Sequence, residues 1–120
     1  MSAEPWPQAI NYDSAQKTLR IHFESGEQFD LPAEYLRVES PSAEVQGHHP
    51  SQKVVVAGRR HVGIRHIEPV GNYAVRLIFD DLHDSGIYSW RFLHELGREY
   101  DARWRDYLAA LVSKGLARDP

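Results

Sequence analysis

Alternating apolar and polar residues mark the first third of the chain as strands. Residues 17–23 alternate with a period of two, which is typical of a half-buried strand, and residues 28–31 repeat the pattern. Between them, Gly26 can adopt the positive φ of a tight turn. The pattern predicts a β-hairpin. Its apolar face consists of Leu19, Ile21, Phe23, Phe29 and Leu31.

Three more strand signals follow in the middle of the chain. Residues 53–58 are a β-branched run that stops at a glycine, and residues 62–70 form a weaker strand pattern. Residues 73–79 give the clearest alternation, after the turn pair Gly71-Asn72. We expect the last two segments to pair as antiparallel neighbours. The apolar face of the clearest strand consists of Tyr73, Val75, Leu77 and Phe79.

Helical signals precede and follow these strands. Pro32 suits the first turn of a short helix over residues 32–40, and Ser89 is a candidate N-cap for a helix that Gly97 could close in the left-handed conformation. Asp101 is a candidate N-cap for the last helix, which we expect to end near Gly115. The apolar stripe of that helix consists of Trp104, Tyr107, Leu108, Leu111 and Val112.

Together these elements predict an α+β fold. It consists of a small, mostly antiparallel β-sheet, made of the N-terminal hairpin plus further strands, with helices packed at its C-terminal end. A chain of 120 residues is sized for one domain. We expect an extended leader over residues 1–16, in which Trp6 pins the terminus, one domain over residues 17–115, and a tail over residues 116–120.

Composition removes several functional classes. The chain has no cysteine, which excludes disulfides, thiolate metal sites and cysteine nucleophiles. Its net charge of −3 makes nucleic acid an unlikely partner. No segment is apolar enough to span a bilayer, and the first residues do not form a signal peptide, so we expect a cytoplasmic protein without a membrane partner.

Two polar segments could supply metal ligands. His48 and His49 are adjacent, but neighbouring side chains in extended chain point to opposite faces, so a surface loop is the simpler interpretation. Residues 80–86 contain Asp81, His83 and Asp84, whose donors suit a divalent cation, although an exposed acidic turn is the commoner case.

A third polar segment is basic. Residues 58–66 gather Arg59, Arg60, Arg65 and His66, which could bind an acidic protein surface or protect a strand edge. No serine-hydrolase, phosphate-loop or dinucleotide motif is present. An enzyme is therefore the minority hypothesis.

Three stretches carry a family resemblance: LPAEYLRVESPSAEVQGH, IEPVGNYAVRLIFDDLHDSGIYSW and FLHELG. They resemble the domain of unknown function DUF971, now called gamma-butyrobetaine hydroxylase-like N-terminal, over Thr18 to Leu111. The resemblance implies a module that occurs alone in bacteria, as the leading domain of 2-oxoglutarate-dependent hydroxylases, or appended to iron–sulfur carrier ATPases. The hydroxylases' catalytic domain has no counterpart in this chain.

The resemblance also implies a degenerate zinc knuckle. Three cysteine positions of the family pattern fall on Ser40, Ser42 and Val45, and the histidine position falls on His83. Only His83 keeps a zinc-binding side chain. A structural zinc contributes on the order of 10 kcal/mol of apparent binding energy in zinc-finger peptides, so another interaction has to hold the loop.

We therefore expect Val45 to pack beside Tyr35, Leu36 and residues 54–56, and His83 to form hydrogen bonds within the loop region. The leading hypothesis is a non-catalytic interaction or accessory module without a cofactor. It would bind a protein partner, with iron–sulfur assembly or carrier proteins as the class that the resemblance suggests. The alternative is a module that binds zinc or iron through His83 with His48, His49, Asp81 or Asp84. A small enzyme is the third class.

Overall fold

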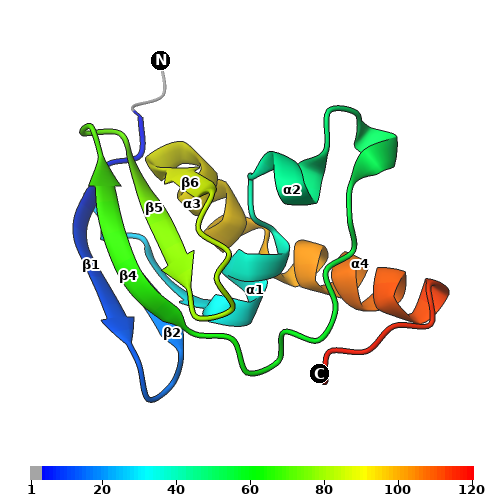
Figure 1. Ribbon diagram of the computed structural model, residues 1–120. Coiled ribbons are helices and arrows are strands. Elements are labelled where there is room, and N and C mark those ends of the chain that lie inside the picture. The colour runs from blue at the N-terminus through cyan, green and yellow to red at the C-terminus, as the bar shows by residue number, and fades with distance from the viewer. Residues whose placement is uncertain (1–3) are drawn as a thin grey trace.

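Two three-stranded antiparallel sheets form the framework of the molecule (Figure 1). The computed structural model describes residues 4–120, apart from the side chain of Pro50. The first sheet has the order β1-β2-β3 and the second has the order β4-β5-β6. Their strands are β1 Pro7–Asp13, β2 Thr18–Phe23, β3 Gln28–Pro32, β4 Ile64–Val70, β5 Ala74–Phe79 and β6 Gly86–Ser89.

Short helices connect the two sheets, and two helices close the chain. Figure 1 shows α4 as the longest of them, running along one side of the molecule below α2. The helices are α1 Ala33–Val38, α2 Ala43–Gln46, the 3₁₀ turn η1 Pro50–Gln52, α3 Trp90–Arg98 and α4 Tyr100–Ser113. The α+β prediction is confirmed, with the strands divided between two sheets rather than joined in one. None of the helices in residues 4–120 is long and apolar enough to cross a membrane.

Both sheets contribute to one apolar core. Leu19 and Ile21 of β2, Leu77 and Phe79 of β5, and Tyr88 of β6 have no exposed surface and belong to the same cluster. The alternation that predicted β2 and β5 thus reflects burial of one face of each strand. The β2–β3 hairpin and the β4–β5 pairing are confirmed, with Leu19 opposite Leu31 and Ile67 opposite Leu77.

The helix α1 lies inside the molecule. All six of its residues are buried, including the charged Glu34 and Arg37. It contributes Tyr35 and Leu36 to the main core and Val38 to a second cluster. That second cluster consists of Val38, Val45, Val56, Tyr107 and Leu111. Two buried charges on a core helix need partners, and these partners shape the site described below.

Several strand expectations were wrong. The predicted leader contains β1, which pairs with β2 through Ile10 and Ile21, while residues 1–3 lie outside the described part. Residues 53–57 form no strand; they run as an extended segment against α4, where the Tyr107 hydroxyl bonds the Val56 carbonyl oxygen. Tyr73 is the last residue of the turn before β5, which begins at Ala74, and it is 56% exposed.

The helix ends also differ in part from the sequence prediction. Ser89 is the N-cap of α3, as expected, and accepts a hydrogen bond from the Phe92 amide. Gly97, however, lies inside α3. A Cβ there would lie 2.4 Å from the Phe29 ring, so close packing against Phe29, and not a left-handed turn, requires a glycine at this position. Asp101 lies in the first turn of α4, whose cap is Glu99.

The buried stripe of α4 is narrower than expected. Tyr107 and Leu111 are buried and Trp104 is half-buried, whereas Val112 is 80% exposed and Leu108 is also exposed. The helix extends past the sheets and rests on residues 55–57, so only one of its faces is covered. It ends at Lys114 and Gly115, as expected, with Gly115 at φ +66°.

Candidate functional site

A serine and a histidine 43 positions apart meet beside the second sheet. Ser40 follows α1, and His83 lies on the turn between β5 and β6. The Ser40 hydroxyl is 2.8 Å from Nε2 of His83, and both residues are buried. The turn is fixed by a hydrogen bond from the Phe79 amide to the His83 carbonyl oxygen and by Leu82 in the left-handed region, at φ +73°.

The second ring nitrogen of His83 also has a partner. Nδ1 lies 3.2 Å from Oε2 of Glu44 on α2. Burial, together with the nearby Arg37 guanidinium, lowers the pKa of His83 below its ordinary value, and the Glu44 carboxylate opposes this only in part. We therefore assign a neutral ring at pH 7. Its Nδ1–H donates to Glu44, and Nε2 accepts from the Ser40 hydroxyl.

Further hydrogen bonds from side chains hold residues 40–46 and the β5–β6 turn together. The Ser42 and Ser85 hydroxyls lie 2.7 Å apart, and Ser42 also caps α2 by accepting from the Glu44 amide. The side-chain amide of Gln46 donates to the Ser40 carbonyl oxygen at 2.7 Å. Residues 40–46 and the β5–β6 turn are thus joined by several neutral and charge-assisted hydrogen bonds.

Val45 packs inward, at 2% exposure. Its neighbours include Val56, one of the residues expected beside it, together with Val38, Tyr107 and Leu111. The other two expected neighbours, Tyr35 and Leu36, belong to the main core instead. The helix α1 contributes to both clusters, with Tyr35 and Leu36 in the main core and Val38 in the second.

These residues do not fit a zinc ion at the positions that the family resemblance indicates. Ser40 and Ser42 offer neutral hydroxyls, Val45 has no donor atom, and both nitrogens of His83 are engaged in hydrogen bonds. Within residues 4–120, no group of three or more His, Asp or Glu side chains is arranged to hold a metal ion.

Glu44, His83 and Ser40 have the connectivity of a serine-hydrolase triad, but their surroundings do not fit that chemistry. Ser40 has no exposed surface. Gly86 lies so close that a Cβ there would be 2.7 Å from the Ser40 hydroxyl. A nucleophile needs room for a substrate atom at about 3 Å. The network is therefore a structural one.

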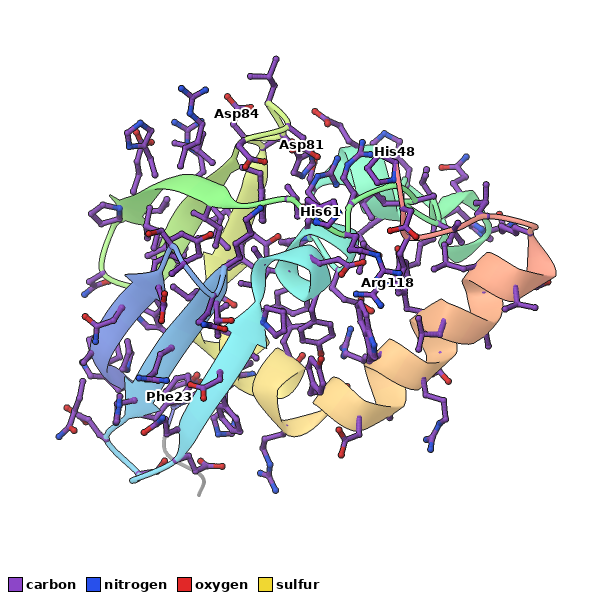
Figure 2. All side chains as sticks on the ribbon, turned by 90° about the horizontal axis from the view of Figure 1, so that it is seen from below. Phe23, His48, His61, Asp81, Asp84 and Arg118 are labelled. Atoms are coloured by element: carbon purple, nitrogen blue, oxygen red, sulfur yellow. The ribbon has the colours of Figure 1, made fainter. Side chains whose placement is uncertain are left out.

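Of the other proposed metal ligands, only Asp81 bonds a residue of this network, through the backbone amide of His83. His48 and His49 are exposed and hydrogen-bonded within their own loop, and Asp84 is exposed. Figure 2 shows Asp81 and Asp84 on the turn after β5, on the side of the molecule where His48 also lies. In the described part of the chain, no hydrogen bond or ion pair connects either loop histidine to His83 or to these carboxylates.

Asp81 connects two arginines. Its Oδ2 accepts from Nε of Arg37 at 2.8 Å and from Nε of Arg59 at 2.7 Å, and its Oδ1 accepts from the His83 amide at 3.1 Å. Burial opposes ionisation of this carboxyl, but the three donors outweigh burial and hold the pKa of Asp81 below its ordinary value. Asp81 is thus a charged bridge between α1 and the segment before β4.

The basic segment is not a uniform stripe. Arg59 shares Asp81, and Arg60 forms an ion pair with Asp119 near the C-terminus. Arg65 and His66 are exposed on β4, where the register shifts between Ile64 and His66. Two of the four side chains are therefore engaged within the molecule.

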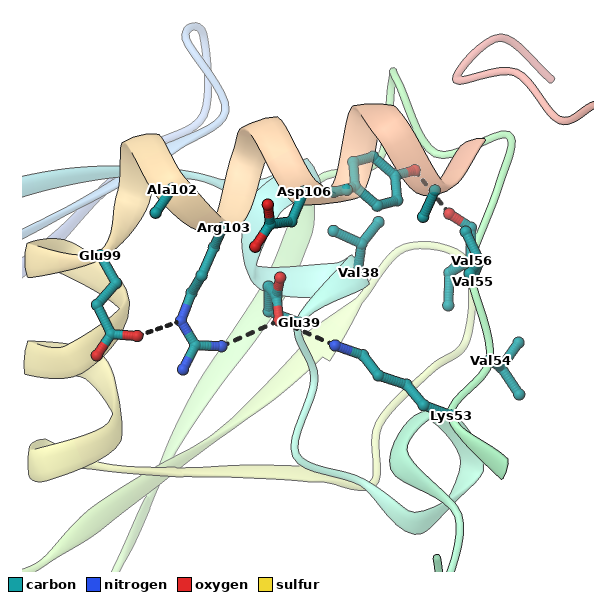
Figure 3. A pocket seen from close by; sticks show the side chains of 12 residues that line it. Val38, Glu39, Lys53, Val54, Val55, Val56, Glu99, Ala102, Arg103 and Asp106 are labelled. Carbon is teal, nitrogen blue, oxygen red and sulfur yellow. Dashed lines mark hydrogen bonds and ion pairs between the residues drawn. The ribbon is translucent and has the colours of Figure 1, made fainter. Parts of the chain in front are cut away.

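Sequence reasoning missed a groove of about 510 Å³ between α4 and residues 53–56 (Figure 3). Its floor is apolar and its rim is charged. Val54 is 49% exposed, and the small side chains of Ala102 and Ala110 leave the space open. The available signal was the β-branched run itself, which has no strand partner. The groove is lined by Val38, Glu39, Lys53, Val54, Val55, Val56, Glu99, Ala102, Arg103, Asp106, Tyr107 and Ala110.

Ion pairs connect most of the rim. Arg103 bonds Glu39 at 3.2 Å and Glu99 at 3.0 Å, and Lys53 lies 3.7 Å from the same Glu39. Asp106 also lines the groove, and it forms no ion pair with another residue of the described part. The rim therefore has three carboxylates against two cations, and the excess charge lies at Asp106.

Comparisons with known proteins agree with this fold. Two proteins solved by NMR are similar to the chain: one is 49% identical, with 98% of this chain and 93% of the other covered, and one is 43% identical, with 100% and 89% covered. Both give a TM-score of 0.85. A crystal structure of a DUF971 protein of unknown function from Acidithiobacillus ferrooxidans is 33% identical, with 76% and 91% covered and a TM-score of 0.65.

No curated protein gives a match. Residues 10–94 match the family described as gamma-butyrobetaine hydroxylase-like, N-terminal, which is more than half of the chain. The chain therefore belongs to the gamma-butyrobetaine hydroxylase-like N-terminal family, also known as DUF971.

Proposed function

We propose that this protein is a non-catalytic interaction module that holds a segment of a partner protein in the groove between α4 and residues 53–56. The observation that carries the proposal is the half-exposed Val54 beside an open apolar floor. Apolar surface of this kind, bordered by charged residues, is typical of protein interaction sites. The partner would gain affinity by covering it.

The charges of the rim favour one kind of segment. Arg103 and Lys53 balance the charges of Glu39 and Glu99, whereas the Asp106 carboxylate is left over. A segment that places an apolar side chain on Val54 and a lysine or arginine beside Asp106 would complement both features.

Two considerations support a role without catalysis. The serine with triad-like connectivity is fully buried, and the chain contains no catalytic domain of the hydroxylase kind. The resemblance to domains appended to iron–sulfur carrier ATPases favours iron–sulfur assembly or carrier proteins as the partner class. In that case the partner binds the iron–sulfur cluster, and this chain positions the partner.

Site-specific photo-crosslinking in the native host tests the proposal. A photoreactive residue replaces Val54 in the groove, and a second one replaces Ile87 of β6, which is equally exposed at 47% but lies outside the groove. We expect a discrete adduct from position 54 only. Mass spectrometry then shows whether the captured protein belongs to iron–sulfur assembly.

Replacement of two different alanines of α4 by arginine provides a test variant and its matched control. Ala102→Arg fills the groove and should abolish the adduct, whereas Ala109→Arg adds the same charge to the exposed side of α4 and should preserve it. Equal adducts from positions 54 and 87, or an adduct that survives Ala102→Arg, would contradict the proposed groove.

The metal-binding alternative has its own test. Elemental analysis of protein purified without a histidine tag measures zinc and iron per chain. About one ion per chain retained through dialysis, and lost in His83→Ala, would favour the alternative. The hydrogen bonds on both nitrogens of His83 lead us to expect no such ion.

A further inference from the structure

Arg37 carries a hydrogen-bonding group without a partner. Its side chain is only 9% exposed, and its Nε is used by Asp81. Its Nη1 is buried and has no hydrogen-bond partner in the described part of the chain. Buried guanidinium groups normally bond all their donors, because an unpaired buried charge is costly. Arg37 therefore keeps hydrogen-bonding capacity that the described part of the chain does not use.

The same arginine lines a cavity of about 280 Å³, which shares residues 54–56 with the groove. Arg59 lines it too, with Nε on Asp81 and Nη1 on the Ala57 carbonyl oxygen. Both arginines thus line one space, and both bond the Asp81 carboxylate. The remaining walls are formed by Glu44, Val45, Val54, Val55, Val56, Ala57 and His83.

We propose that this cavity binds a carboxylate carried on a short aliphatic body. The planar fork of an arginine side chain matches the two oxygens of a carboxylate, and Arg37 is fixed before the ligand arrives. The valines and Ala57 would contact the aliphatic part.

Local charge selects a singly charged ligand over a phosphate dianion. Arg37 and Arg59 carry two positive charges, and Asp81 neutralises one of them. The Glu44 carboxylate lies at the same cavity and is 69% exposed, so it brings the sum of these four charges to zero and repels a dianion more strongly than a monoanion. His83 donates to Glu44 and adds no positive charge when neutral.

The carboxylate could belong to a free acid or to the C-terminus of a protein chain. Both are tested by NMR titration of the ¹⁵N-labelled full chain, read at the arginine Nε–H signals and the amides of residues 54–57. The probes are isovalerate, inorganic phosphate, sodium chloride at equal ionic strength, and a peptide ending in valine as the free acid or as the amide. We expect saturable shifts with isovalerate or with the free-acid peptide, and none with the amide.

Variants separate the site from general charge. Arg59→Gln should weaken binding by about tenfold, since it removes one charged donor. Arg60→Gln, the adjacent residue outside the cavity, should change it by less than about twofold. Ala57→Leu fills the cavity without altering any charge and should also abolish binding. The amide spectrum of each variant reports whether it has folded.

Three results would overturn the inference: tighter binding of phosphate than of either carboxylate, shifts that do not saturate, or equal losses in the Arg59 and Arg60 variants. Binding by isovalerate assigns the ligand to small acids, and binding by the free-acid peptide alone assigns it to a chain terminus. The inference does not depend on the proposed function, because Ala102→Arg blocks only the groove and should leave carboxylate binding unchanged.

Discussion

Glu34, at the start of the buried helix α1, is held by Arg118, two residues before the end of the described chain. Nη2 of Arg118 lies 2.6 Å and Nε lies 2.8 Å from the two carboxylate oxygens, although 84 positions separate the residues. The guanidinium group also lies 5.1 Å from the centre of the Trp104 ring. The segment expected to be a simple tail therefore supplies the counter-charge of a core carboxylate.

Removal of this counter-charge should destabilise the protein. Arg118→Ala leaves the Glu34 carboxylate buried, with 7% of its side chain exposed, and without its charged donor. We expect a loss of about 1–3 kcal/mol in the free energy of unfolding, measured with urea. Arg20→Ala breaks an ion pair of which both partners are about half exposed, and should cost less than about 1 kcal/mol. Equal losses would argue against a role for the tail.

The Ser40 hydroxyl should matter for stability and not for a reaction. Ser40→Ala leaves Nε2 of the buried His83 without its donor, which should lower the free energy of unfolding by about 1–3 kcal/mol. His83→Ala should have a loss of similar size. The control is Ser51→Ala in the exposed loop, with an effect within about 0.5 kcal/mol. A variant that unfolds no more easily than this control would contradict the structural role of the network.

Acid should weaken the folded state through His83. Its pKa is lowered by burial, so below an unfolded pKa of about 6.5 the unfolded chain binds this proton more readily than the folded one. The stability that the neutral His83 ring contributes is fully present above pH 6.5, and it is lost as the pH falls through the pKa of His83 in the folded state. Wild type should therefore lose more stability between pH 7 and pH 5 than His83→Gln, which cannot titrate. If the free energy of unfolding fell equally with pH in both proteins, or more steeply in the variant, the Glu44 and Asp81 carboxylates would favour the charged His83 ring enough to offset burial.

Gly97→Ala should be destabilising although alanine is the better helix former. Alanine normally gains about 1 kcal/mol over glycine inside a helix. Here the added methyl group would lie 2.4–2.7 Å from atoms of the Phe29 ring, so overpacking by about 1–3 kcal/mol should outweigh that gain. In a Phe29→Ala background the clash is absent, and Gly97→Ala should become neutral or stabilising. Additive effects in this double-mutant cycle would refute the contact as the cause.

Chelator treatment tests whether the fold depends on an ion. We expect the thermal unfolding midpoint after exhaustive dialysis against a chelator to match that of untreated protein. The reason is that the positions where the family resemblance places zinc ligands carry hydrogen-bonded side chains and the packed Val45 side chain. A midpoint that falls and is restored by added zinc or iron would show the opposite.

The sequence pattern correctly predicted those strands and helix ends whose form depends on residues close together in the chain. The alternation around Ile21 and Leu77 gave two strands correctly, because each buries one face only. The Ser89 cap and the Gly115 terminus were also read correctly, since both depend on backbone chemistry within a few residues. The resemblance located Ser40 and His83, which the structure brings into contact.

Features set by distant contacts were not predictable in this way. Gly97 has the sequence context of a helix terminus, and only the Phe29 ring on β3 explains why it is inside the helix. Residues 54–56 have strand propensity, but Tyr107 and α4 hold them away from any sheet. Arg59 lies in a polar stretch typical of exposed charge, and only the folded structure brings it to Asp81, which also bonds Arg37. In each case the deciding partner lies more than 20 residues away in the chain.

Val54, Val55 and Val56 line both the groove and the arginine-lined cavity. A substitution in this run therefore alters two surfaces at once, and its effect cannot be attributed to either of them alone. Ala102 lines only the groove and Ala57 lines only the cavity. These two small side chains are therefore the positions at which the two surfaces can be altered independently.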